Sequence, residues 1–308
     1  MTPALNAAIA LLLEGVSRKD LEKRAAKLSV SYRDGGTSAA IADPADALAY
    51  LVTRAPATFA AAAAVFGRIG EAVPDFAPMS HLDVGAGPGT AALAARAAWP
   101  SVAGSVLVEP NPVFRDLAAR LLPEARLIAG KAGAPKPRAA LVSASYVLAE
   151  LAEAEAARVT LELWQVADGM LVLIEPGTPA GFARIRAARA ALIAAGGHVA
   201  APCTHDRACP LTGADWCHFS QRLARSRDHR IAKGASVPYE DERYAYVAVS
   251  RAPVAHSAVA RIIKPAIETK PGITLPLCEV AGLRNAFIAR RDKETFRAMR
   301  KKDWGDLV

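Results

Sequence analysis

Apolar and polar positions repeat along this chain with two different periods. In residues 1–75, leucine, isoleucine and alanine recur at the spacing of one helix face, and polar residues or proline precede each stretch. This pattern predicts a helical region. From residue 81 onward, short apolar runs bounded by turn residues take over, which is typical of buried strands in a parallel sheet.

The expected strands and helices alternate through the middle of the chain. Strands are predicted at 81–85, 105–109, 139–143 and 170–175, each followed by a helix, at 90–98, 112–122, 152–166 and 181–195. Two later runs, at 198–201 and 243–249, are expected to close the sheet as an antiparallel pair. The order predicts an α/β fold, a Rossmann-like doubly wound sheet with helices on both faces.

The pattern divides the chain into three parts. Residues 1–76 form the predicted N-terminal helical region, and 77–250 form the sheet domain with a cysteine-rich insertion at 202–235. Residues 251–308 form a basic C-terminal section. The 52% hydrophobic content excludes a mostly disordered chain. No apolar run reaches the ~18–20 residues of a membrane span, so we expect no membrane partner. We also expect a monomer.

A glycine-rich loop follows the first predicted strand. Asp83 precedes Gly85, Gly87 and Gly89, and a helix follows, which is the context of a nucleotide-binding turn. The spacing fits S-adenosylmethionine better than a dinucleotide, because Asp83 can accept from the ammonium of that ligand and no pyrophosphate is needed. Glu109 ends the next strand, where it can accept both ribose hydroxyls. A plain turn and a nicotinamide site are the alternatives.

The stretch after the strand at 139–143 offers only weak catalytic candidates. Tyr146 can stack on a base or on the cofactor, and Ser145 can form a hydrogen bond to it. No carboxylate or amide stands where it would polarise an amino group, and no cysteine is present as a nucleophile. We therefore favour a packing role for Tyr146 and leave the catalytic residues unassigned.

The four cysteines are the most informative residues of the chain. Cys203, Cys209 and Cys217 share one short window, and Cys278 follows after 60 intervening residues. Four thiolates saturate one tetrahedral zinc ion or one iron–sulfur cluster. The C-x2-C pairs of zinc ribbons and the C-x3-C-x2-C triad of radical enzymes are absent, so a structural cluster is favoured. Zinc is the alternative, with His205 or His218 able to replace a thiol.

The N-terminal residues bear on the compartment. No signal peptide or organelle transit peptide is recognisable, so we expect a cytoplasmic protein, and reduced thiols in that compartment favour metal ligation over disulfides.

The net charge of +8 is unevenly distributed. Residues 1–200 carry 19 Lys+Arg against 18 Asp+Glu, whereas residues 201–308 carry 19 against 12. This excess beside the cysteines indicates a polyanionic partner, and a solvated surface is the alternative. Aromatic residues are sparse there, which favours recognition of the backbone and shape of folded RNA. The candidate RNA-binding residues are Arg222, Arg225, Arg227, Arg230 and Lys233, with further basic groups from Arg261 to Lys302.

Several segments together resemble one known family. They lie at 32–33, 54–58, 82–90, 109–111, 175–177, 201–203, 209–211, 215–219, 240–242, 261–265 and 304–306. On these segments the chain resembles the methyltransferase-like small-ribosomal-subunit assembly proteins, known from the mitochondrial small subunit and from bacterial homologues. The similarity spans almost the whole chain, and the cysteine window is its most specific part.

The resemblance carries expectations about fold, ligands and partners. It implies a class I methyltransferase fold that holds S-adenosylmethionine, with Asn111 joining Glu109 in the cofactor site. It implies a [4Fe–4S] cluster on Cys203, Cys209, Cys217 and Cys278, and association with 16S-type rRNA of the small ribosomal subunit. We therefore expect an RNA-binding assembly factor. An active rRNA methyltransferase and a small-molecule methyltransferase with a structural zinc site are the alternatives.

Overall fold

The N-terminal quarter of the chain is helical, as the apolar spacing predicts. The computed structural model describes residues 3–33, 36–256 and 259–308. The order is α1 (Pro3–Leu12), α2 (Arg18–Arg33), the short 3-10 turn η1 (Ser38–Ala40), α3 (Pro44–Thr53) and α4 (Ala55–Ala72). Alanine-rich faces of α3 and α4 are buried, so these two helices pack closely.

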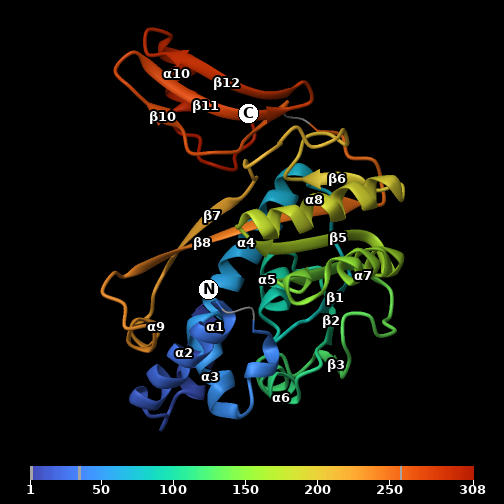
Figure 1. Ribbon diagram of the computed structural model, residues 1–308, viewed down its shortest axis with the longest axis vertical. Helices are drawn as coiled ribbons and strands as arrows, with labels where there is room; N and C mark the ends of the chain where they lie inside the picture. Colours follow the sequence, from blue (N-terminus) through green and yellow to red (C-terminus); the bar gives the residue numbers. More distant parts are fainter. Residues whose placement is uncertain (1–2, 34–35, 257–258) are drawn as a thin grey trace.

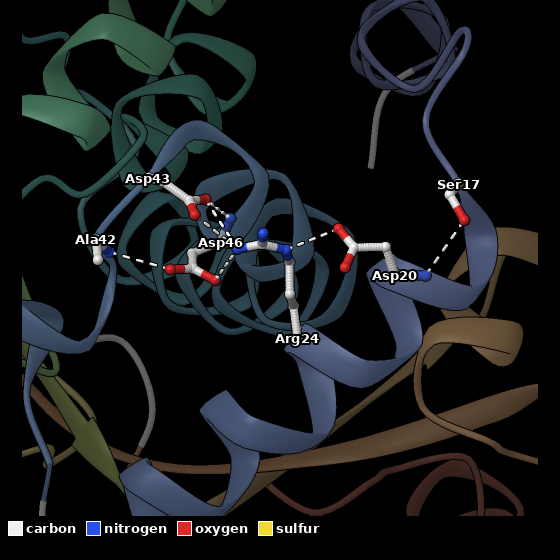
Figure 2. Close-up of polar contacts among 6 residues, drawn as sticks. All are labelled: Ser17, Asp20, Arg24, Ala42, Asp43 and Asp46. Carbon is white, nitrogen blue, oxygen red and sulfur yellow. Dashed lines mark hydrogen bonds and ion pairs between the residues drawn. The ribbon is translucent and has the colours of Figure 1, made fainter.

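A charged cluster fixes α2 against the start of α3. Arg24 projects from α2 and forms ion pairs with Asp20 (2.8 Å), Asp43 (2.8 Å) and Asp46 (2.7 Å), as Figure 2 shows. Asp43 also caps α3, since its Oδ1 accepts a hydrogen bond from the Asp46 N–H (2.9 Å). The Oδ2 of Asp46, which is not the oxygen that pairs with Arg24, accepts a hydrogen bond from the Ala42 N–H (3.2 Å). The cluster therefore holds the segment that leads from η1 into α3.

The central sheet has the expected doubly wound architecture. Its strands are β1 (Ser80–Val84), β2 (Gly104–Val108), β3 (Arg126–Ile128), β4 (Ala139–Ser145), β5 (Ala167–Pro176), β6 (His198–Ala201), β7 (Phe219–Ala224) and β8 (Tyr239–Ser250). The main order is β3-β2-β1-β4-β5-β8-β6. The first five strands are parallel, whereas β8 runs antiparallel to β5 and β6. This is the α/β arrangement of class I methyltransferases, so the predicted fold class is confirmed at this level.

Helices cover both faces of this sheet, as Figure 1 shows. Alternate residues of β5 point to opposite sides: Met170, Val172 and Ile174 pack with the N-terminal helices, whereas Leu171 and Leu173 join the other core. The first face is covered by α4 and α5 (Thr90–Ala98), and the second by α7 (Glu153–Val166) and α8 (Pro179–Ala194). Helix α6 (Pro112–Leu121) follows β2, and the short 3-10 turn η2 (Leu148–Glu150) follows β4.

The expected cysteine-rich insertion at 202–235 is only partly irregular. Residues 202–218 form a loop without regular structure, but β7 then pairs with the first half of β8 in an antiparallel ribbon. The short helix α9 (Arg227–Ala232) lies at the far end of this ribbon and packs against α2 and α3. Three polar residues in succession, Ser220 to Arg222, interrupt the apolar positions of β7 and conceal its strand pattern, which explains why the sequence did not predict it.

The C-terminal section forms a second, smaller sheet, which the sequence did not predict. Its strands are β9 (Ala260–Ile262), β10 (Ile267–Glu268), β11 (Gly272–Glu279) and β12 (Gly282–Ala289), followed by α10 (Lys293–Met299). Ile273, Leu275, Leu277 and Phe296 form a core of its own. Two of its strands have only three and two residues, Pro276 lies within β11, and β12 exposes Leu283 and Phe287, so the polar and apolar positions give no clear strand pattern.

Among the described residues, no single helix is long and apolar enough to cross a membrane. The bent pair α3 and α4, which meet at 49°, passes that test together by length and composition.

Candidate functional site

The glycine loop lies at the carboxyl end of β1, where ligands bind in sheets of this kind. Gly85, Gly87 and Gly89 all have positive φ, at 68°, 55° and 83°. A Cβ at Gly85 would lie 2.4 Å from Val147, and one at Gly89 would lie 2.6 Å from Leu122, so packing demands glycine at both positions. A Cβ at Gly87 would meet nothing within 4 Å, so its surroundings are open to a ligand.

Asp83, the expected partner of a cofactor ammonium, is almost completely buried. Its Oδ1 accepts a hydrogen bond from Ser143 Oγ (2.7 Å), and the same hydroxyl lies 2.8 Å from His81 Nε2. Burial raises the pKa of Asp83 to about 7, against the opposing effect of the Ser143 hydrogen bond. Burial also lowers the pKa of His81 to about 3. This row of side chains ties β1 to β4, so Asp83 has a structural role whether or not it meets a ligand.

Glu109 orients the loop through backbone hydrogen bonds. Its Oε2 accepts from the Gly87 N–H (2.8 Å) and its Oε1 from the Asn111 N–H (2.8 Å). Burial raises the pKa of this carboxyl, and the two N–H donors oppose the rise. Both oxygens retain a lone pair, so the predicted ribose contact stays a prediction.

Asn111 connects the loop region to the N-terminal helices. Its Oδ1 caps α6 by accepting from the Val113 N–H (2.9 Å), while its Nδ2 donates to the carbonyls of Ser38 (3.0 Å) and Ile41 (2.9 Å). Glu150 accepts from the Ser38 N–H (3.2 Å). The segment around η1 therefore lies against the loop region, held by the Arg24 cluster of Figure 2 on its other side.

The weak catalytic candidates are both directed into the protein. Tyr146 is a non-glycine residue with positive φ (63°), and its hydroxyl donates to Glu242 Oε1 (2.9 Å). Burial and the charge of Glu242 raise the pKa of Tyr146 well above its ordinary value. The Ser145 Oγ is buried and has no partner within the described residues. The favoured packing interpretation of Tyr146 agrees with these contacts, although strain at such a position is often a mark of a functional site.

Glu175 was not singled out as a functional residue by sequence reasoning. It ends β5, is completely buried, and accepts a hydrogen bond from the Leu148 N–H (2.9 Å). Burial raises its pKa to about 8. Perturbed carboxyls gather at functional sites, and the only sequence signal was the position of Glu175 in the family segment 175–177.

The four cysteines line a single cavity of about 40 Å³. Cys203, Cys209 and Cys217 come from the loop after β6, and Cys278 comes from β11 of the second sheet. All four are free thiols. The volume is several times what one buried water needs, and the remaining lining is mostly apolar, with the side chains of Arg189 and Arg261 beside the thiols.

Burial dominates the electrostatics of these thiols. It raises the pKa of Cys203, raises that of Cys217 well above its ordinary value, and raises that of Cys278 to about 12, with neighbouring thiols adding to the rise. A bound cation reverses this preference, because thiolate is the ligating form.

Across residues 3–33, 36–256 and 259–308, no group of three or more His, Cys, Asp or Glu side chains is arranged to hold a metal ion. The predicted metal-binding role of the insertion is therefore a proposal. His205 is buried with neither ring nitrogen partnered by a described residue, and His218 stacks on Trp216 (5.2 Å).

The candidate RNA-binding residues divide into two groups. Arg222 forms two hydrogen bonds of 2.8 Å to Asp241, while Arg225 and Lys233 both form ion pairs with Glu240 (3.1 and 2.7 Å). Arg227 and Arg230 lie on α9 and are exposed, without an acidic partner among the described residues. Arg261 is 2% exposed, so it is a structural residue rather than an RNA contact.

The fold, the glycine loop and its buried carboxylates define a methyltransferase-like protein of class I. The chain belongs to the family described as mitochondrial small ribosomal subunit Rsm22, whose model matches residues 44–308. The expected resemblance to methyltransferase-like small-subunit assembly proteins is thereby confirmed.

Curated relatives of this chain are known from human and fission yeast. It is 28% identical over 291 residues to the "Ribosome assembly protein METTL17, mitochondrial" of Homo sapiens, covering 85% of this chain and 62% of the relative. It is 27% identical over 344 residues to the "Rsm22-cox11 tandem protein 2, mitochondrial" of Schizosaccharomyces pombe, covering 91% and 45%. The chain thus spans less than two thirds of the length of either relative.

A solved structure with partial similarity is a magnesium protoporphyrin IX methyltransferase from Synechocystis with bound SAM. It has 14% sequence identity and a TM-score of 0.41, and the match covers 64% of this chain and 80% of that chain.

The relatives contradict the cytoplasmic location expected from the sequence, because both are named as mitochondrial proteins. The expectation rested on the lack of a recognisable targeting segment, and such a lack does not determine the compartment.

Proposed function

We propose that this protein is a methyltransferase-like assembly factor of the small ribosomal subunit. It binds S-adenosylmethionine at the glycine loop, holds a [4Fe–4S] cluster on Cys203, Cys209, Cys217 and Cys278, and contacts small-subunit rRNA. The observation that carries the proposal is the gathering of all four cysteines around one cavity in a chain of the Rsm22 family. The name of the human relative, a ribosome assembly protein, supports the ribosomal role.

The thiol cavity supports a cluster better than a zinc ion. Four thiols are the donor set of a saturated cluster, and they come from the 202–218 loop and from β11, which a bound core would join. The C-x2-C pairs that are typical of structural zinc sites are absent from this chain, which favours the cluster. When bound, the cluster supplies a crosslink between the 202–218 loop and β11.

The glycine loop supports the binding of S-adenosylmethionine. Gly87 leaves open space for close approach of a ligand, and Glu109 holds the Gly87 amide in place through a hydrogen bond of 2.8 Å. Asn111 fixes the N-terminal segment beside the loop, which limits the access of water. These residues are arranged to bind and orient a nucleoside.

A scaffold is favoured over an active methyltransferase. Transfer to a base requires a group that accepts or polarises a proton beside the methyl donor. The hydroxyl of Tyr146 is instead committed to Glu242, and the Ser145 hydroxyl is buried. The active rRNA methyltransferase is the second candidate. The positive φ of Tyr146 favours it, because strained backbone conformations gather at active sites.

Anaerobic purification tests the metal assignment. We expect a brown protein with a broad absorption band, and about four iron and four sulfide per chain for a [4Fe–4S] cluster. A colourless protein with one zinc would replace the cluster by the zinc alternative. A protein with neither metal would refute the metal site.

Transfer of a labelled methyl group separates scaffold from enzyme. Purified protein is incubated with S-adenosylmethionine carrying a labelled methyl and with immature small subunits. We expect cofactor binding by calorimetry, retention of the protein on the subunit, and no label in the rRNA. Labelled rRNA would establish the methyltransferase, and absence of rRNA binding at low salt would favour a small-molecule enzyme.

A further inference from the structure

Two buried arginines flank the thiol cavity. Arg189 lies on α8 of the main domain and is 5% exposed, and Arg261 lies on β9 of the second sheet and is 2% exposed. Both side chains line the same cavity as the four cysteines. Arginine is almost never buried to this degree unless its charge is compensated.

Neither guanidinium has a carboxylate partner in the part of the chain that the structure describes. Arg189 Nη2 donates to the carbonyl of His205 (2.7 Å), and its buried Nε has no partner. Arg261 donates from Nε to the carbonyl of Pro202 (2.5 Å) and from Nη1 to that of Gly305 (2.7 Å). Carbonyls satisfy hydrogen bonds but do not neutralise a cation, and an uncompensated buried charge is costly.

The geometry also places these two cations beside the thiols. Arg261 is the cross-strand partner of Cys278 in the β9–β11 pair, so their side chains share one face of the second sheet. The Arg261 Nε also donates to the carbonyl of Pro202, which is the residue before Cys203. Arg189 holds the carbonyl of His205, which lies in the loop between Cys203 and Cys209.

We propose that Arg189 and Arg261 are positioning residues that balance the negative charge of the four thiolates and of the core bound to them. The inference rests on the proposed function, because the thiolates form only when that core is bound. Four thiolates outweigh a dicationic core, so the loaded site is anionic. Two buried cations stabilise it, and they favour the reduced, more negative state of a cluster over the oxidised state.

Arg189 is the better residue to test, because Arg261 also joins Pro202 to Gly305 and its loss would disturb several segments. Arg186 is a matched control. It lies one turn away on α8 at the edge of the same cavity, but it is exposed and donates only to the carbonyl of Leu211 (3.2 Å). Solvent screens its charge, so its removal should have little effect.

The experiment compares full-length wild type with Arg189→Gln, Arg189→Lys and Arg186→Gln after anaerobic purification. Redox titration gives the midpoint potential of the cluster, and an iron chelator gives the rate of iron loss. Arg189→Gln should shift the potential to more negative values and speed iron loss about 10- to 100-fold, the usual effect of losing a partner next to the ligands. Arg189→Lys should restore most of the potential, and Arg186→Gln should match wild type.

Circular dichroism and S-adenosylmethionine binding show whether each variant is folded. A folded Arg189→Gln with the wild-type potential and rate of iron loss would overturn the inference while leaving the proposed cluster intact. If the wild-type protein holds zinc, the same variants are compared by their rate of zinc loss. Faster loss from Arg189→Gln is then expected, and an unchanged rate would overturn the inference. Wild type that binds neither metal overturns both the proposed cluster and this inference.

Discussion

The glycine loop and the thiol cavity are built in opposite ways. At the loop, the Glu109 carboxylate accepts hydrogen bonds from the backbone N–H groups of Gly87 and Asn111, which follow the neighbouring parallel strands β1 and β2. At the cavity, four thiols and two buried cations come from α8, one loop and a second sheet, and no carboxylate of the described residues balances them. The first region is therefore self-supporting, whereas the second depends on what it binds.

The largest expected effect is the loss of one cysteine. Cys209→Ser should abolish metal binding and separate the 202–218 loop from β11, because the crosslink between the two sheets would be lost. We expect the free energy of unfolding of the C-terminal section to fall by several kcal/mol, measured by chemical denaturation of the anaerobic protein. Ala208→Ser, one residue away and exposed, is the control. Unchanged metal content and stability in Cys209→Ser would show that the thiol region does not depend on a bound metal, and the contrast with the glycine loop would fail.

A pair of glycine substitutions tests whether the loop is self-supporting. Gly89→Ala should lower the free energy of unfolding by about 2–4 kcal/mol, since a left-handed alanine is strained and its Cβ would lie 2.6 Å from Leu122. Gly87→Ala should cost only about 1 kcal/mol, because its surroundings are open, and should act mainly on S-adenosylmethionine affinity. Denaturation and calorimetry measure both. Equal losses of stability would contradict the assigned roles.

The pH dependence of stability tests the buried carboxyl beneath the loop. The pKa of Asp83 is raised to about 7 in the folded protein, so between pH ~4 and ~7 the folded state binds more protons than the unfolded state. Stability from this group is present at low pH and is lost as pH rises through that window, by up to about 1.4 kcal/mol per pH unit. Thermal unfolding of Asp83→Asn should lack this decline.

His81 provides the internal comparison for that experiment. Its pKa, lowered to about 3, gives stability that is lost as pH falls below ~6.5, the opposite slope, and it is present in both proteins. The difference between wild type and Asp83→Asn therefore isolates Asp83. Parallel curves across the window would show that Asp83 is ionised in the folded state.

The smallest expected effect concerns RNA binding at α9, at the far end of the β7–β8 ribbon. Arg227→Ala should reduce the salt dependence of rRNA binding by about one unit of slope, because an exposed cation without an acidic partner can release a counterion from a phosphate. Arg222→Ala should change it less, since Asp241 already neutralises that side chain. Filter binding at several salt concentrations measures both slopes. Equal slopes in the two variants would show that ion pairing on β8 does not decide the RNA contacts.

Local patterns in the sequence determined the main sheet, the glycine loop and the identity of the four candidate ligands. Apolar runs, glycines before a helix and clustered cysteines are all signals between near neighbours. Strand β7, the first residues of β8 and the second sheet were missed, because their polar and apolar positions do not alternate regularly enough to show a strand period. Arg261 was counted with the RNA-binding cations for a different reason. Its burial in the fold cannot be read from its position in the sequence.

Only the tertiary structure decided which groups meet. It brought Cys278 of the second sheet to the cavity of the other three thiols, placed two buried cations there, and paired Arg222, Arg225 and Lys233 with acids of β8. These meetings depend on how strands distant in sequence are brought together, whereas the glycine loop depends on the φ values of a few adjacent residues. The sequence by itself therefore determined the nucleoside-type loop, and the packing of two sheets decided the surroundings of the thiols.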